Sequence, residues 1–261
     1  MPLRERVRRS GQHGELGTAK APLPGPGLLR VAMTTMLAFC SMLTVGGACL
    51  VLLLWRQHND NGVLTEHLDR VWEIFGYLRD IERWVALGVV PVAVAWIAVA
   101  TLNVGRATGQ RPNSIVAALS LPAGLAGAWF VGSELLTPDH EPLVRGAGFA
   151  LQVVFLALPL VAIERVAEAA EARHRPLRAA FVIGAGYLAQ LQFFSALSTT
   201  EETRDPQEWG RLGALLLIAA LLQVLGTLSV NEAARAIEDG SQHRFELRQR
   251  FGESVMAQAV R

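Results

Sequence analysis

The sequence predicts an all-α membrane protein: a six-transmembrane-helix bundle with both termini cytoplasmic and an extracytoplasmic amphipathic helix between the first two spans. Three observations predict this fold class. Several long segments are almost free of charge, the charged residues (18% of 261) gather in short islands between them, and basic residues favour alternate islands. A helix needs about 20 apolar residues to cross a bilayer core about 30 Å thick.

Six segments meet this length or nearly do, and we expect them to form a transmembrane domain over residues 29–230. In chain order they cover about 29–55, 84–104, 115–136, 147–163, 177–197 and 212–230. The first is longer than the apolar region of a cleaved signal peptide, about 7–15 residues, so we expect a retained anchor. The fourth is the shortest, and we expect its helix to continue past Glu164 into water.

Polar tails flank this domain on both sides. Residues 1–28 carry several arginines and end in a stretch dense in proline and glycine, which does not form a helix. We expect a disordered, basic cytoplasmic tail there. Residues 231–261 begin with alanines and charges at helical spacing, which favours a cytoplasmic helical tail. We expect Gly240 to end the first helix of this tail.

The placement of arginine predicts the orientation, because basic residues accumulate on the cytoplasmic side of a membrane. With the N-terminus in the cytoplasm, 17 of the 24 basic residues fall in inner segments, whereas two outer loops, 137–146 and 198–211, are rich in acidic residues. Of the 24 basic residues, 23 are arginine, which is typical of a GC-rich bacterial genome. We therefore expect the plasma (inner) membrane of a bacterium.

Residues 63–82, in the long loop after the first span, predict the extracytoplasmic amphipathic helix. Apolar residues recur there at intervals of three and four, and charged residues take much of the other face. Such a helix could lie in the membrane interface, close over the mouth of the bundle, or bind a partner protein. The apolar stripe includes Leu64, Leu68, Val71, Trp72, Phe75 and Leu78.

Ionisable side chains are costly inside a membrane and are usually functional where they occur. None of the six histidines falls within a predicted span, and no Asp, Glu, Lys or Arg falls in the middle of one. We therefore expect no buried carboxylate suited to a proton relay. Phosphate-binding, dinucleotide-binding and CxxC motifs are also absent from the sequence. We expect no catalytic residue, no metal site and no cofactor.

Neutral polar side chains do occur within the predicted spans. An amide in hydrocarbon needs a partner, and hydrogen bonds between helices there contribute roughly 0.6–2 kcal/mol. These amides could join helices, or they could line a path for a solute. Two of them lie two residues apart, about 200° around a helix, so those two cannot share a face. The candidates are Gln152, Gln190, Gln192 and Gln223.

This combination favours a non-enzymatic accessory or assembly subunit that acts in the lipid bilayer through a membrane-protein partner or a second copy of itself. We expect no nucleic-acid binding, because topology accounts for the arginines of the tails. Two alternatives stay open. One is a transporter or channel for a small uncharged or weakly polar solute. The other is an interfacial membrane enzyme, whose candidate acid–base cluster is Glu134, Asp139, His140 and Glu141.

Cysteine labelling tests the predicted orientation. In a variant with Cys40 and Cys49 replaced by alanine, we expect Thr199→Cys to react with a membrane-impermeant maleimide on intact cells, because its loop is predicted to face outward. Ser10→Cys, in the predicted cytoplasmic tail, should react only after lysis. Labelling of Ser10→Cys on intact cells would contradict the orientation.

Overall fold

The computed structural model describes residues 22–61, 65–109, 113–136, 141–198 and 206–259, and these form helices and short connections without any strand. The helices are α2 (Pro26–Asn61), α3 (Thr65–Thr108), α4 (Ser114–Leu135), α5 (Pro142–Ala169), α6 (Arg175–Ser198) and α7 (Pro206–Ala259). The fold class is therefore all-α, as predicted.

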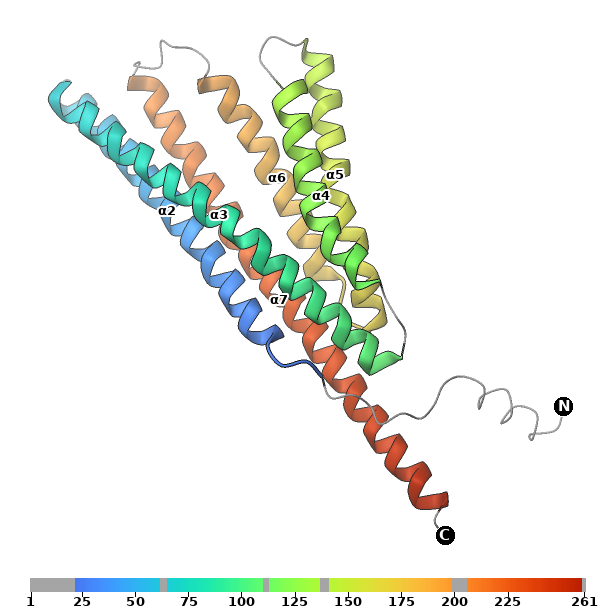
Figure 1. Ribbon diagram of the computed structural model, residues 1–261. Coiled ribbons are helices and arrows are strands. Elements are labelled where there is room, and N and C mark those ends of the chain that lie inside the picture. Colours follow the sequence, from blue (N-terminus) through green and yellow to red (C-terminus); the bar gives the residue numbers. More distant parts are fainter. Residues whose placement is uncertain (1–21, 62–64, 110–112, 137–140, 199–205, 260–261) are drawn as a thin grey trace.

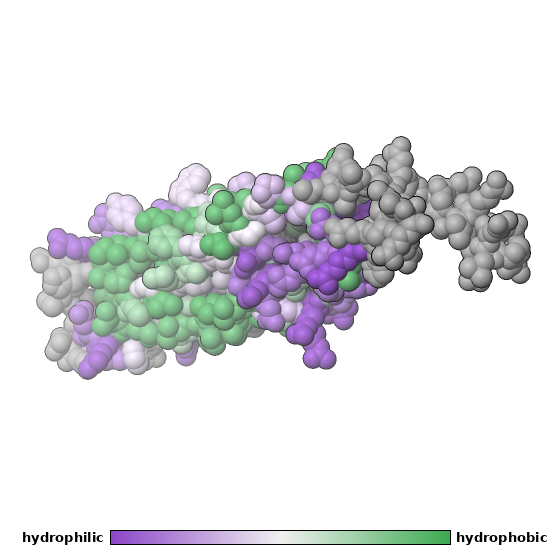
Figure 2. Space-filling model, turned by 90° about the horizontal axis from the view of Figure 1, so that it is seen from below, coloured by the Kyte–Doolittle hydropathy of each residue, from purple (hydrophilic) through white to green (hydrophobic). Residues whose placement is uncertain are grey.

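Five of the helices contain a stretch that is long and apolar enough to cross a membrane. These stretches are Pro26–Asn59, Arg70–Thr108, Ser114–Leu135, Leu143–Ala169 and Glu208–Arg250. On the face that Figure 2 shows, apolar residues form a band with hydrophilic residues on either side of it. This distribution fits a multi-pass membrane protein.

Figure 1 shows how the helices are grouped. The long helices α2, α3 and α7 run side by side, α4 and α5 form a hairpin, and α6 lies between α7 and that hairpin. Helices α3 and α7 run in the same direction and α2 runs against them. The three long helices therefore form a frame to which the other three attach.

Two apolar clusters hold the bundle together, one near Trp209 at the start of α7 and one near Ile237, about 42 Å farther along the helix. At the Trp209 end, Trp209 and Leu216 pack with buried residues of α2 and with the start of α3. At the Ile237 end, the buried cluster draws on α3, α4, α5 and α7. Its members are Trp96, Ile97, Ala100, Val104, Ala117, Ala118, Val166, Ala167, Ala170, Ala172, Ala234 and Ile237. The α4–α5 hairpin therefore joins the frame mainly at the Ile237 end.

Helix α3 differs from the prediction. We predicted residues 63–82 as a helix separate from a span at 84–104, whereas the structure has a single helix, Thr65–Thr108. No glycine or proline lies between residues 77 and 87 to end the first helix. The apolar stripe packs against α2, where glycines leave room for its side chains. Phe75 of the stripe lies 3.0 Å from the position that a Cβ on Gly47 would take.

Helix α7 also differs, because it does not end at Gly240 but continues to Ala259. A Cβ on Gly240 would collide with the carbonyl oxygen of Ala170, at the end of α5. The glycine therefore serves a close approach of two helices rather than a helix end. The helix of the fourth predicted span continues past Glu164, as expected, and ends at Ala169.

The α4–α5 hairpin depends on a close approach of the same kind. A Cβ on Gly124 of α4 would lie 2.7 Å from the backbone oxygen of Phe155 and 2.9 Å from Pro159 on α5. Small residues let membrane helices approach closely in this way, and the gain is van der Waals contact along both backbones. Gly146, on α5, has open space where its Cβ would be.

Substitution of these two glycines by alanine tests the packing. We expect Gly124→Ala to lower the free energy of unfolding by about 1–3 kcal/mol, because the added methyl group meets a backbone atom that cannot turn away. Gly146→Ala is the matched control and should leave the stability unchanged or slightly raised. The measurement is thermal unfolding in detergent micelles, and equal midpoints for the two variants would refute this account of the hairpin.

Candidate functional site: a buried polar cluster and an exposed face of helix α3

An acidic residue, Glu82, is buried within the bundle with only 7% of its surface exposed. It contacts Thr44, near the middle of the apolar stretch of α2, and Gln223, near the middle of that of α7. The expectation that the bundle offers no buried carboxylate is therefore wrong. The cause is the predicted start of the second span at Trp84, which left Glu82 just outside it.

Both oxygens of the Glu82 carboxylate have partners from several helices. Its Oε1 accepts hydrogen bonds from Thr44 Oγ1 and Gln223 Nε2, each at 3.0 Å. Its Oε2 accepts from Arg79 Nη1 at 2.6 Å, one turn earlier on α3. Gln223 Nε2 also donates to Tyr187 Oη on α6 at 2.9 Å. We refer to Thr44, Arg79, Glu82, Tyr187 and Gln223 as the Glu82 cluster.

The Glu82 cluster fixes how α3 is rotated about its own axis. An unpaired buried carboxylate costs several kcal/mol, and removal of one member of a buried ion pair costs about 3–5 kcal/mol. Glu82 keeps its partners only while it faces α2 and α7. The side chain of Arg79 is 37% exposed, so the arginine reaches the carboxylate from the edge of the buried region. A rotation of α3 would carry Arg79 and Glu82 together, but Glu82 would lose its hydrogen bonds from Thr44 and Gln223.

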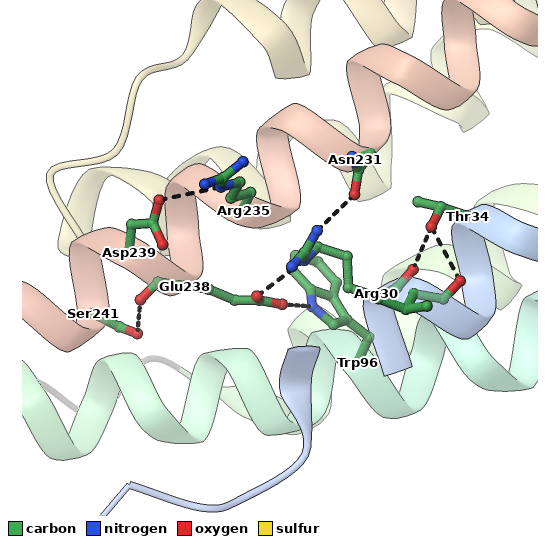
Figure 3. Close-up of polar contacts among 9 residues, drawn as sticks. Arg30, Thr34, Trp96, Asn231, Arg235, Glu238, Asp239 and Ser241 are labelled. Atoms are coloured by element: carbon green, nitrogen blue, oxygen red, sulfur yellow. Dashed lines mark hydrogen bonds and ion pairs between the residues drawn. The ribbon is translucent and has the colours of Figure 1, made fainter. Parts of the chain in front are cut away.

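A second polar cluster, shown in Figure 3, ties the same three helices near the Ile237 end. Arg30 of α2 donates to Glu238 at 3.0 Å and to Asn231 at 2.8 Å, both on α7. Trp96 of α3 donates from Nε1 to the other oxygen of Glu238 at 2.8 Å. Glu82 and Trp96 are 14 residues apart, which is about 21 Å along a helix. The two polar clusters therefore fix both the position of α3 along its axis and its rotation about that axis.

The opposite side of α3 carries charged and aromatic side chains that no other helix covers. Tyr77 is 61% exposed and Trp84 is 73% exposed. Glu73 and Asp80 are exposed as well, and Tyr77 donates a weak hydrogen bond of 3.3 Å to Glu73 within the helix. We define the α3 face as the exposed residues Arg70, Glu73, Tyr77, Asp80, Arg83, Trp84 and Leu87.

The contacts of α3 show which part of α7 lies at the same height as the α3 face. Trp72 packs against Trp209 and Glu82 binds Gln223, so the α3 residues between them lie beside residues 209–223 of α7. Most of that stretch is apolar. A charged side chain in the middle of a bilayer costs about 2.5–3.5 kcal/mol on insertion scales. Asp80 is the most costly member, because its short side chain cannot reach toward water as a longer one does.

The structure places the predicted apolar stripe inside the bundle. Trp72 makes edge-to-face contacts with Phe75 and Trp209, at ring-centroid distances of 5.6 and 6.4 Å, and Val71 packs against the same cluster. Leu78 lies 3.8 Å from the Cβ position of Gly46. Leu64 and the side chain of Leu68 lie outside the described residues.

The predicted glutamines do not come together. Gln152 of α5 donates to the carbonyl oxygen of Ala128 on α4 at 3.0 Å, and Gln190 of α6 donates to that of Leu215 on α7. Gln223 belongs to the Glu82 cluster, and the side chain of Gln192 lies outside the described residues. Each described glutamine therefore joins its own helix to a neighbour, and the three do not surround a common space.

The other candidate chemistry is largely outside the described part of the chain. Asp139 and His140 fall there, Glu134 is exposed at the end of α4, and Glu141 is exposed at the start of α5. Within the described residues, no three His, Cys, Asp or Glu side chains gather as metal ligands would.

Comparison of the chain with known protein families, curated proteins and solved structures found no match.

Two neighbouring alanine substitutions test the role of the Glu82 cluster. We expect Glu82→Ala to lower the free energy of unfolding by about 1–3 kcal/mol, because Thr44 and Gln223 lose their buried hydrogen-bond acceptor. Asp80→Ala is the control on the exposed side and should not destabilise the protein. Denaturant titration in mixed micelles measures both.

A double substitution distinguishes the ion pair from a general packing defect. Replacement of both Arg79 and Glu82 by leucine removes the two charges together, so it should be less destabilising than Glu82→Ala. If Glu82→Ala and Asp80→Ala unfolded alike, the Glu82 cluster would have no part in fixing α3.

Proposed function

We propose that the protein is a non-enzymatic accessory or assembly subunit of a membrane protein complex, and that it binds its partner through the α3 face. The observation that carries the proposal is the exposed position of Glu73, Asp80 and Tyr77 beside an apolar stretch of α7. Lipid does not solvate carboxylates, so this face needs protein or water against it.

Contact with protein fits the α3 face better than contact with water. Its exposed charges alternate with large apolar and aromatic side chains, such as Trp84 and Leu87, which are 73% and 56% exposed. Aromatic residues and arginine are enriched where proteins bind one another. The Glu82 cluster holds the face outward, so the chain does not bury it by turning α3.

The proposal includes the cellular setting predicted from the sequence. All six helices α2–α7 cross the plasma (inner) membrane of a bacterium, with both termini in the cytoplasm. The 24 residues of α6 measure about 36 Å as a helix, which suffices for a span. The excess of arginine in alternate loops supports this orientation.

The two alternatives have less support. A solute path lined by amides would need the glutamines to face a common space, whereas Gln152 and Gln190 bind carbonyl oxygens of different helices. An interfacial enzyme would depend on Asp139 and His140, which lie outside the described residues. Neither alternative explains why charged side chains stand exposed beside an apolar stretch.

Photocrosslinking in living cells of the source organism tests the proposal. We expect a photoreactive amino acid in place of Tyr77 to give one discrete crosslinked protein, because Tyr77 lies at the centre of the α3 face. The same residue in place of Trp129, which is 74% exposed on α4, is the control and should not give this product. Asp80→Ala should reduce the yield at Tyr77 several-fold.

A failure at Tyr77 would be decisive for the proposal. If position 77 gave no protein product while the variant was present at the normal level in the membrane, the α3 face would not be a partner site.

A further inference from the structure

The acidic residues of the α3 face lie on its midline. Glu73 and Asp80 are seven residues apart, so they are about 10.5 Å apart along the axis and within about 20° of the same direction. Tyr77 lies between them, and Trp84 continues the line. The midline therefore presents two carboxylates at a spacing of one heptad.

The arginines of the face lie on its two flanks. From the direction of Glu73, Arg70 is about 60° to one side and Arg83 about 80° to the other. Both are exposed. A helix that packs on α3 meets the midline first, so it meets the two carboxylates and the aromatic rings before the arginines.

Charge disfavours a second copy of this chain as the occupant. Two copies in one membrane share their orientation, so a twofold axis between them runs along the membrane normal. Midline residues then face their own counterparts, which brings Glu73 to Glu73 and Asp80 to Asp80. Like charges at close range in a medium of low dielectric constant repel strongly. The phosphates of lipid headgroups are disfavoured for the same reason.

We propose that the occupant is a membrane-spanning helix of a different protein, with two basic residues seven positions apart that pair with Glu73 and Asp80. This inference rests on the proposed function and adds the chemistry of the partner. Arginine suits the role best, since its guanidinium binds a carboxylate through two parallel hydrogen bonds. Tyr77 and Trp84 pack against apolar residues of the same partner helix.

Designed helices test the inference without knowledge of the partner. The full-length protein in phosphatidylcholine vesicles is mixed with a labelled leucine-rich transmembrane peptide that carries two arginines seven residues apart. Two control peptides carry glutamine or glutamate at those positions. Energy transfer between labels measures binding. We expect the arginine peptide to bind at least tenfold more tightly than the glutamine peptide, and the glutamate peptide not to bind.

Substitutions on the α3 face complete the test. The double variant Glu73→Gln and Asp80→Asn should lose the tenfold preference. The double variant Glu73→Arg and Asp80→Arg should reverse it in favour of the glutamate peptide. Glu168→Gln, at an exposed residue of α5, is the matched control and should keep the preference of the natural sequence. A reversed peptide preference cannot come from a loss of stability, because an unfolded variant would not favour the glutamate peptide.

Two results would overturn the inference. One is equal binding of the three peptides. The other is a disulfide-linked dimer of this chain through Tyr77→Cys in the same vesicles, which would make a second copy the occupant. If peptide selectivity is absent but the photoreactive residue at position 77 still captures a different protein in cells, only the inference about charge fails. If nothing is captured there, the proposed function itself fails.

Discussion

The arrangement of this bundle depends on one buried carboxylate, that of Glu82, and on its hydrogen bonds from two other helices. The carboxylate is stable within the apolar bundle only because α2 and α7 each supply a hydrogen-bond donor to it and Arg79 supplies the opposite charge. Helical geometry then determines the rest, because Asp80 lies about 200° from Glu82 on the same helix. To bury one carboxylate, α3 must expose the other, and the internal contact thereby defines the external surface.

The two polar clusters also explain why α2, α3 and α7 form one unit of the bundle and the α4–α5 hairpin another. Helices α2, α3 and α7 are joined at the Glu82 cluster and again by Arg30, Trp96 and Glu238. The α4–α5 hairpin meets α3 chiefly in the alanine-rich cluster at the Ile237 end, where small side chains allow close packing without polar contacts. Hydrogen bonds therefore fix the geometry of the frame. The hairpin is seated by small apolar residues and by ion pairs of Glu164 with Arg178 and of Glu171 with Arg244.

The sequence predicts the helices well and their contacts poorly, for physical reasons. Long apolar runs make the existence of membrane helices evident, and Glu73 and Asp80 of α3 are exposed, as predicted, whereas Arg79 reaches the buried Glu82. Glu82 was missed because the span was taken to start where the charges end. A signal was present, since Glu82 follows Phe75 and Leu78 by seven and four residues and so shares their buried side. Its partners Thr44 and Gln223 are 38 and 141 residues away in the chain, beyond the reach of any local pattern.

The length of α7 has a mechanical consequence. The helix extends without interruption for 54 residues, about 81 Å, and Gly240 does not break it. Beyond Glu238 the helix still contacts its neighbours, since Gly240 approaches Ala170 and Arg248 donates to the carbonyl oxygen of Arg106. Its final 11 residues, beyond Arg248, form an arm of about 16 Å. A change of 5° in the tilt of α7 within the frame would move the tip of a rigid arm of that length by about 1.4 Å, and a rotation of α7 would turn the arm through the same angle. A rigid arm of this kind would convert a change in the tilt of α7 into displacement at the C-terminal end.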